Sequence, residues 1–225
     1  MWVFEASCII QMNIKAKLSQ KFMARILEHV DKNIEHVYSG IKKKLFSQIR
    51  KKDKVLEIGA GTGVNFKYYH KGLNLMVIEP NVLLHEPLLR NALLNKINIK
   101  IIKSSEKLPF DDMSFDFVVS TLVLCSVHDV RKSLIEIKRV LKKRGKFLFI
   151  EHILDYGNSF RRGIQHVLAY SPWVFFGDNC HPNRRTSELI LKSGFSDVKI
   201  KRYYQNGLGF MGWWIKRHVV GKAVK

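Results

Sequence analysis

The ten residues from Val55 to Val64 (VLEIGAGTGV) constrain this chain more than any other stretch, because they join a buried strand to a glycine-rich turn. The apolar run at their start is typical of a strand that is covered on both faces. Three glycines follow at alternate positions: Gly59, Gly61 and Gly63. They let the backbone turn tightly and approach a ligand without a Cβ in the way.

The same loop excludes two common nucleotide sites. A dinucleotide-binding loop would have its third glycine at position 64, where this chain has Val64. A P-loop would continue with Gly-Lys-Ser/Thr, and Asn65-Phe66 follow here instead. Glu57 lies inside the strand end, where an acidic side chain costs desolvation unless hydrogen bonds or a cation meet it. An acidic glycine loop of this kind suits a nucleoside that carries an amino acid rather than a phosphate chain, which indicates S-adenosylmethionine.

A second apolar run, Leu75–Ile78, predicts the next buried strand, and Glu79 stands at its end. An acidic side chain at this place can accept hydrogen bonds from both hydroxyls of a bound ribose. The feature alone fits an NAD enzyme equally well, so it does not discriminate between the two cofactors. Pro80 and Asn81 follow directly and are expected to line the same site.

Two further motifs follow a third predicted strand, Ile99–Ile102: the runs Ser105–Phe110 (SEKLPF) and Ser114–Val119 (SFDFVV). Together with the glycine loop, in this order and at this spacing, they resemble the class I S-adenosylmethionine-dependent methyltransferases across roughly residues 53–155. Within that family they are similar to hallmarks of the ubiquinone- and phospholipid-type branch.

The resemblance implies S-adenosylmethionine as the cofactor and assigns its contacts to Glu57, Gly59, Gly61, Gly63, Glu79, Pro80, Asn81, Ser105, Glu106 and Leu122. Many members of the family have aspartate at the position of Ser104, where it commonly binds the adenine amino group. Here Ser104 or Ser105 is expected to hydrogen-bond the base edge instead.

Shorter stretches look like the thiol methyltransferase group of membrane-associated mammalian enzymes and their bacterial relatives: Thr121–Val127, Phe149–His152, Gly177–Thr186 and Gly221–Lys225. Related bacterial chains with similar motifs can methylate other acceptors. The resemblance therefore implies a methyltransferase for a small lipophilic acceptor, which is a thiol, a phospholipid or a quinone-like molecule.

Methyl transfer from a sulfonium is an in-line displacement whose leaving group needs no protonation, so holding donor and acceptor in line supplies much of the rate. A base is required only where the acceptor carries a proton, and for a thiol that proton matters because the thiolate is the nucleophile. The candidates for deprotonating or positioning an acceptor are His152, His181 and Asp129, each of which also fits a structural role. Cys125 is interpreted as a buried apolar residue.

Apolar runs that alternate with helical patterns predict an α/β fold, a doubly wound, mostly parallel seven-stranded sheet of Rossmann-like methyltransferase type. Helices are expected from Asn65 onward and over Leu83–Leu94, Val130–Leu141 and Thr186–Ser193. Gly145 is expected to end the helix before the fifth strand. Apolar residues recur every three or four positions from Lys17 to about Arg50, which predicts amphipathic helices broken near Ser39-Gly40. We expect residues 1–52 to form an N-terminal helical cap and residues 53–225 a single methyltransferase domain.

The formal net charge of +20 is concentrated toward the two ends of the chain. A basic excess suits a negatively charged surface, either a membrane or nucleic acid. Aromatic side chains accompany the basic ones in two clusters, Phe160–Phe176 and Gly207–Val220. Such a combination favours the boundary between water and lipid, so an anionic membrane surface is an expected partner. The alternative role for these aromatics is to complete the last strands and the acceptor pocket.

Two other functions compete with this hypothesis. An RNA methyltransferase would use the basic surface, but Thr121-Leu-Val-Leu stands where amino-group methylases of nucleic acids usually carry an Asn-Pro-Pro-Tyr/Phe tetrad, which argues against a nucleic-acid partner. A cofactor-binding scaffold without activity would have no need to keep Glu57, the three glycines and Glu79 together.

The three cysteines, Cys8, Cys125 and Cys180, are widely spaced and include no C-x-x-C pair, which predicts neither a disulfide framework nor a zinc site. We therefore expect reduced thiols, no bound metal and a cytoplasmic location, with peripheral contact to a membrane. Residues 1–14 lack the basic segment that opens a secretory signal, and Met12 is an alternative start. No apolar run reaches the ~20 residues that a membrane span requires.

Overall fold

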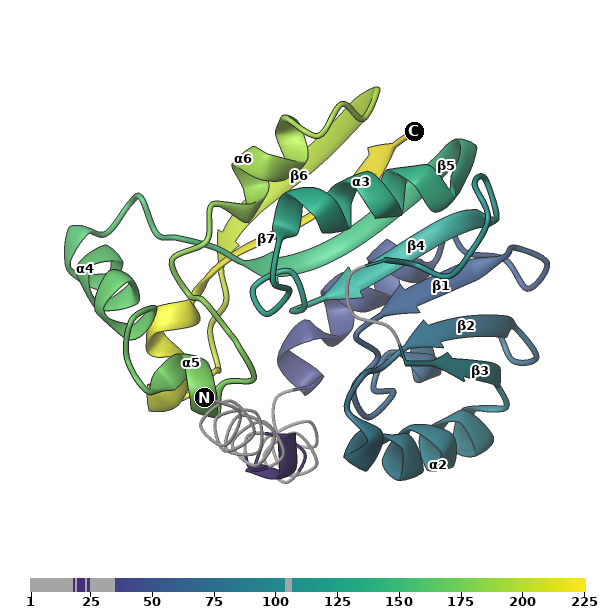
Figure 1. The fold of residues 1–225 in the computed structure, drawn as a ribbon, viewed down its shortest axis with the longest axis horizontal. Coiled ribbons are helices and arrows are strands. Elements are labelled where there is room, and N and C mark those ends of the chain that lie inside the picture. Colours follow the sequence, from purple (N-terminus) through teal and green to yellow (C-terminus); the bar gives the residue numbers. More distant parts are fainter. Residues whose placement is uncertain (1–17, 19, 23, 25–34, 104–106) are drawn as a thin grey trace, which may run out of the picture.

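The computed structural model describes residues 18, 20–22, 24, 35–103 and 107–225, which are built around one β-sheet (Figure 1). Its strands are β1 (Val55–Ile58), β2 (Asn74–Ile78), β3 (Asn98–Ile102), β4 (Phe115–Thr121), β5 (Leu141–His152), β6 (Asp197–Tyr204) and β7 (Arg217–Val224). They stand in the order β3-β2-β1-β4-β5-β7-β6, and β7 runs antiparallel to both of its neighbours. The predicted mostly parallel, seven-stranded α/β fold is confirmed.

Helices cover both faces of the sheet. In Figure 1, α3 (Val130–Val140) and α6 (Thr186–Leu191) lie in front of the sheet, and a helix over residues 35–46 lies behind it. The other helical elements are η1 (Phe66–Tyr68), η2 (Val82–Leu84), α2 (His85–Asn95), α4 (Ser159–Leu168), α5 (Trp173–Phe176) and η3 (Phe210–Ile215).

Each face carries its own buried apolar cluster. Leu56 and Ile58 enter the cluster shared with α3, whereas Val55 enters the cluster shared with α2 and the helix over residues 35–46. This division follows because successive side chains of a strand point to opposite faces. Glu57 therefore points to the same face as Val55, and only 1% of its surface is exposed.

The helix over residues 35–46 runs unbroken through Ser39 and Gly40, so the predicted break is wrong. A Cβ on Gly40 would meet nothing within 4 Å, which places the glycine on an open side of the helix. Glycine costs about 1 kcal/mol in a helix interior, and the burial of Tyr38 and Phe46 outweighs that cost. Most of the predicted cap, residues 1–52, lies outside the described residues before position 35, so the cap stays a prediction.

The helix predicted from Asn65 is a single turn, η1, because Asn65 directs its side chain back to β1. Gly145 was expected to end a helix, but α3 ends at Val140 and Gly145 lies inside β5. The register between β4 and β5 shifts between Phe115 and Phe117, where β5 bulges. A Cβ on Gly145 would lie 2.9 Å from the Lys142 carbonyl oxygen, so the bulge rather than a helix end requires glycine here.

The strand order reverses beside β1. From β1 the chain continues to β2 and β3 on one side of the sheet, and it then reaches β4 and β5 on the other side. In an open parallel sheet such a reversal creates a crevice at the carboxyl ends of the strands. The loops after β1, β2, β4 and β5 meet at this edge. The first three carry predicted site residues: Gly59, Gly61, Gly63, Glu79, Pro80, Asn81, Leu122 and Asp129.

Candidate active site

The loop after β1 adopts a left-handed backbone at all three glycines, with φ of 62° at Gly59, 57° at Gly61 and 82° at Gly63. Protein side chains fill the space beside two of them. A Cβ on Gly59 would lie 2.6 Å from Val123 Cγ2, and one on Gly63 would lie 2.7 Å from Phe66 Cε2. A Cβ on Gly61 would meet nothing within 4 Å. Gly61 is thus the point of the loop that a ligand can approach.

The buried carboxylate of Glu57 braces this loop. Its Oε1 accepts a hydrogen bond from Asn65 Nδ2 (2.7 Å), and its Oε2 accepts one from the Tyr69 hydroxyl (2.8 Å). Burial raises the pKa of Glu57 to about 7, although both hydrogen bonds act in the opposite direction. The two oxygens thus tie β1 to the segment that follows it, and a direct contact between Glu57 and the cofactor stays a prediction.

The raised pKa of Glu57 predicts a loss of stability with rising pH. The folded protein holds this proton more tightly than the unfolded chain, so the contribution to stability is complete below the ordinary pKa of 4.5 and is lost as pH rises through about 7. The difference corresponds to about 3 kcal/mol. Glu57→Gln should flatten the fall in unfolding free energy between pH 4.5 and 7.5, measured by urea denaturation. The matched control is Glu86→Gln at an exposed position of α2, and equal slopes in both variants would contradict the assignment.

Glu79 stands at the end of β2 and joins two loops. Its Oε2 accepts a hydrogen bond from the Gly61 backbone N–H (2.8 Å), and its Oε1 accepts one from the Asn81 N–H (2.9 Å). Burial raises the pKa of Glu79 despite these bonds. A carboxylate has about four lone-pair positions, so Glu79 retains acceptor capacity for a ligand beside Gly61.

The residues after Glu79 differ in exposure. Pro80 is exposed, and Asn81 is buried and begins η2, with its Oδ1 accepting from the Leu83 N–H and its Nδ2 donating to the Gln20 carbonyl. Asn81 therefore has a local structural role. Ser105 and Glu106 lie outside the described residues.

The open space at Gly61 and the carboxylate of Glu79 fit a cofactor that carries a ribose. Hydroxyl donors of the ribose would meet Glu79, and the backbone at Gly61 allows close approach. Leu122, directly after β4, adopts φ of 59°, an uncommon conformation for a bulky residue, and its N–H donates to the Ile150 carbonyl at 2.8 Å. Strained backbone of this kind clusters at functional sites, so Leu122 keeps its place as a candidate contact.

Glu151, near the end of β5, was not predicted as a site residue. It is fully buried; its Oε1 accepts a hydrogen bond from Ser120 Oγ (2.6 Å), and its Oε2 accepts one from the Leu124 N–H (3.1 Å). Burial raises the pKa of Glu151 to about 6. This carboxylate holds the loop after β4 against β5. The signal for it in the sequence is an acidic residue at the end of an apolar run, as for Glu57.

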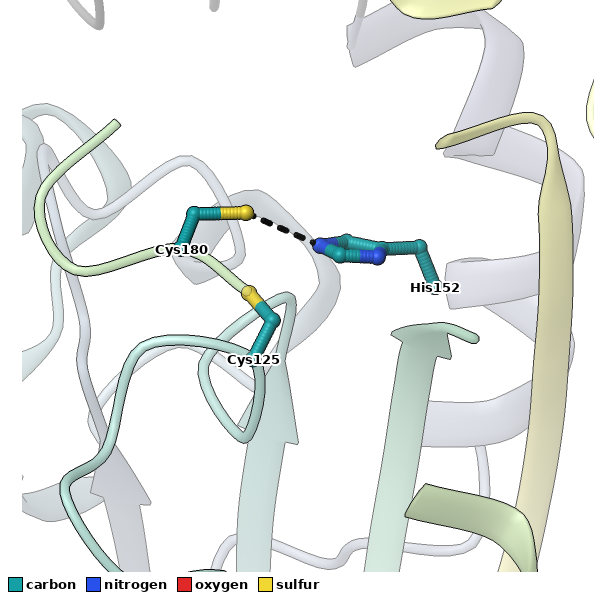
Figure 2. A group of neighbouring side chains, drawn as sticks. All are labelled: Cys125, His152 and Cys180. Atoms are coloured by element: carbon teal, nitrogen blue, oxygen red, sulfur yellow. Dashed lines mark hydrogen bonds between the residues drawn. The ribbon is translucent and has the colours of Figure 1, made fainter. Parts of the chain in front are cut away.

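His152 ends β5 and is buried beside two sulfur atoms (Figure 2). Its Nε2 lies 3.3 Å from the Cys180 Sγ, and Cys125 Sγ completes a group in which the three atoms lie within 4.8 Å of one another. His152 Nδ1 is buried without a hydrogen-bond partner among the described residues. Burial disfavours the charged imidazole, but the Cys125 sulfur and the Glu151 carboxylate outweigh burial and raise the pKa of His152.

The other two candidate bases are engaged elsewhere. His181 Nδ1 is 2.7 Å from the Asn179 carbonyl oxygen, in the loop that leads to α6. Asp129 caps α3, since its Oδ1 accepts hydrogen bonds from the N–H groups of Arg131 (2.8 Å) and Lys132 (3.2 Å). These bonds lower the pKa of Asp129, which keeps it ionised and committed to the helix. A catalytic role for either residue stays a prediction.

Known proteins share this fold and these motifs. A family model for a methyltransferase domain matches residues 56–149. Thiol S-methyltransferase TMT1B of Rattus norvegicus is 35% identical over 194 residues, which cover 82% of this chain and 78% of the relative. Ubiquinone/menaquinone biosynthesis C-methyltransferase UbiE of Rickettsia prowazekii is 34% identical over 43% of each chain. A SAM-dependent methyltransferase of Thermotoga maritima, 19% identical, superposes with a TM-score of 0.63 over 91% of this chain and 99% of its own.

The fold, the glycine loop and these matches define a class I S-adenosylmethionine-dependent methyltransferase. Within that class, the chain belongs to the family of the thiol S-methyltransferases TMT1A and TMT1B. S-adenosylmethionine is its cofactor, and when bound it supplies an electrophilic methyl group.

Replacing Glu79 with alanine is expected to weaken cofactor binding by about 1.5–3 kcal/mol, roughly 10- to 150-fold, because hydrogen bonds to a charged group are lost. Isothermal titration calorimetry with S-adenosylhomocysteine measures the change. Glu86→Ala, at an exposed position of α2, is the control for loss of one negative charge. An unchanged dissociation constant in Glu79→Ala would remove this carboxylate from the ribose site.

Proposed function

We propose that this protein transfers a methyl group to the sulfur of a small lipophilic thiol. The observation that carries the proposal is the identity of 35% with a thiol S-methyltransferase over 194 residues. That match is about twice as long as residues 56–149, so it extends well beyond the part of the chain that the methyltransferase family model matches.

Two groups of residues would serve this reaction, one that binds the cofactor and one that handles the proton of the acceptor. The turn around Gly61 and the carboxylate of Glu79 would hold the cofactor. The acceptor thiol must lose its proton, because the thiolate is the nucleophile. Buried His152, with one ring nitrogen beside Cys180 and the other without a partner among the described residues, is the candidate group for handling that proton.

A paired assay tests the proposal. Purified protein with methyl-labelled S-adenosylmethionine is offered an alkyl thiol, the alcohol of equal chain length, phosphatidylethanolamine and a quinone-type phenol. We expect label in the thioether and little in the other products. Transfer to phosphatidylethanolamine or the phenol without transfer to thiols would assign the enzyme to another acceptor class.

We also propose that the protein docks on anionic membranes through α4. Phe160 and Val167 lie at helical spacing along α4 and are 72% and 71% exposed, and Tyr170, just after the helix, is 88% exposed. The same helix carries the basic residues Arg162 and His166. Aromatic and aliphatic side chains next to cations suit the interface of an anionic bilayer. No helix in the described part of the chain is both long and apolar enough to span a membrane.

Trp213 and Trp214, the other aromatic pair of this region, are packed within the protein. Trp214 makes an edge contact with Trp173 at 5.1 Å between ring centroids, and Trp213 lies over Arg161, with 4.4 Å from the ring centroid to Cζ. Their replacement would therefore disturb protein contacts as well as any lipid contact. Phe160 of α4 also makes an edge contact with Trp213, at 6.1 Å between ring centroids, but Phe160 and Val167 are 72% and 71% exposed and so offer the cleaner test.

The double variant Phe160→Ala/Val167→Ala is expected to bind anionic vesicles less tightly than the wild type at high salt. Salt screens exposed charges over about 8–10 Å, so the binding that survives it reflects buried apolar area. Vesicle cosedimentation at increasing salt measures both parts. Leu93→Ala/Leu94→Ala is the matched control, since these leucines are 79% and 73% exposed on α2 (Figure 1). Absence of vesicle binding at low salt would refute the membrane proposal and leave the methyltransferase intact.

A further inference from the structure

We propose that Cys125, His152 and Cys180 form a binding site for a thiophilic divalent metal ion of the zinc type. We further infer that the ion takes the acceptor sulfur as its fourth ligand, an extension that rests on the proposed thiol methyltransferase function. Figure 2 shows the two sulfur atoms and the imidazole nitrogen turned toward one shared space.

The spacing of the three atoms suits a tetrahedral ion. With Zn–S of about 2.3 Å and Zn–N of about 2.1 Å, ideal zinc geometry places sulfur and nitrogen about 3.6 Å apart and two sulfurs about 3.8 Å apart. The Cys180 Sγ lies 3.3 Å from His152 Nε2, and all three atoms lie within 4.8 Å of one another. Small side-chain rotations therefore suffice to bring the three atoms to metal-binding distances.

The donor set selects the kind of ion. Two thiolates and an imidazole are the ligands that zinc prefers, whereas magnesium and calcium prefer oxygen. The side chains are buried, with Cys125, His152 and Cys180 exposing 3%, 2% and 7% of their surface. Among the described residues no fourth histidine, cysteine or carboxylate joins this group. Three protein ligands with one open position are typical of catalytic rather than structural zinc sites.

The fold holds the two cysteine loops in place without the ion. The Cys125 carbonyl accepts a hydrogen bond from the His181 N–H (2.9 Å), directly after Cys180. Arg184 Nη1 donates to the Leu124 carbonyl at 2.7 Å, and Asn179 Nδ2 donates to the Ser126 carbonyl at 2.7 Å. These bonds join the loop after β4 to the loop after α5. The cysteines are widely spaced along the chain, which is why the sequence predicted no zinc site, but the tertiary structure brings Cys125 and Cys180 together.

A disulfide between the two cysteines is the competing interpretation. It would use two of the three converging atoms and leave His152 Nε2 beside an oxidised sulfur, whereas a metal ion uses all three. Metal binding requires no oxidant. The ion displaces one proton from each thiol, and two thiolates neutralise its double charge.

The site lies where an acceptor must arrive. The loop that carries Cys125 includes Val123, whose side chain fills the space beside Gly59 in the cofactor loop. The Cys125 loop and the glycine loop are therefore in contact at the carboxyl edge of the sheet. An acceptor thiol that binds the ion loses its proton to solvent, because a coordinating thiol is deprotonated outright. The bound sulfur would then stand close to the cofactor loop.

Titration of metal-depleted, reduced protein with Co²⁺ tests the site directly. We expect one equivalent to bind, with thiolate-to-cobalt charge-transfer bands in the near ultraviolet and d–d bands of tetrahedral intensity, and we expect Zn²⁺ to displace it. Cys125→Ser, Cys180→Ser and His152→Asn should each weaken Co²⁺ binding at least tenfold. The controls Cys8→Ser, outside the described residues, and His70→Gln, on the surface, should retain it. Melting temperature and S-adenosylhomocysteine binding show that each variant is folded.

The outcomes separate the site from the function. The metal site would be overturned if the reduced wild type does not bind Co²⁺ tightly, or if the cysteine variants bind it equally well. A Cys125–Cys180 disulfide in protein isolated without reductant would support the competing interpretation. Addition of an alkyl thiol should shift the cobalt bands, and the alcohol of equal length should not; an unchanged spectrum would overturn the fourth-ligand inference. Full thiol methylation by chelator-treated protein would also overturn that inference while leaving the proposed function intact. Co²⁺ binding without methylation of any thiol would refute the function and leave the metal site standing.

Discussion

Gly61→Val is expected to lower the affinity for S-adenosylmethionine by more than about a hundredfold, a loss equivalent to about 2.8 kcal/mol. Gly61 adopts φ of 57°, and a Cβ there points into space that protein atoms leave open within 4 Å. A branched side chain would occupy that space, where we expect the cofactor to bind. It would also disturb the hydrogen bond that the Gly61 N–H donates to Glu79 Oε2.

The chain supplies a matched control for this substitution. Gly209 has a similar φ of 66°, and a Cβ there also meets nothing within 4 Å, but the residue lies in the loop before η3. Gly209→Val also forces a branched side chain onto a backbone with positive φ, here with ψ of −172°, without filling the cofactor site. Calorimetry with S-adenosylhomocysteine and thermal melting of both variants separate the two effects. A Gly61→Val protein that binds the cofactor normally would show that the loop does not face it.

The strands and the cofactor loop could be predicted because their signals are local. Apolar runs fix the interior strands, and the glycines of the loop are the residues that a left-handed backbone favours. Local signals failed where packing decides the outcome. Gly40 continues a helix because Tyr38 and Phe46 are buried on either side of it in sequence, and Gly145 serves a bulge in β5 that depends on pairing with β4.

The part of the site that we propose for the acceptor was less predictable, because its members come from segments distant in the sequence. Cys125, His152 and Cys180 meet only when the loop after α5 folds back onto the loop after β4. Glu151 was overlooked. Like Glu57, it is a buried carboxylate that needs hydrogen bonds to offset its desolvation, and it accepts them from Ser120 and two backbone N–H groups. Spacing along the chain carries no information about such convergence.

His152→Asn is expected to lower kcat/KM for a thiol acceptor by about 10²- to 10⁴-fold, the usual contribution of a positioned group that handles a proton. The dissociation constant for the cofactor should change little. His152 lies beside the cysteines at the end of β5, and in the described part of the chain no hydrogen bond joins it to the glycine loop or to Glu79. The loss is expected whether the imidazole acts on the proton itself or through a bound metal ion. Asparagine is preferred to alanine because the site is buried and a smaller residue would leave a cavity.

Comparing the activity losses of variants at the three candidate bases identifies which of them handles the proton. His181→Asn should cost less than about tenfold, because His181 Nδ1 is already engaged with a backbone carbonyl oxygen, and that local bond is worth about 1 kcal/mol. Asp129→Asn preserves a capping residue at α3, since asparagine caps helices about as well as aspartate. Rates at saturating cofactor across pH 6 to 9, with exposed His70→Asn as the control, rank the three. A larger loss at His181 than at His152 would move the proton-handling group from the end of β5 to the loop before α6.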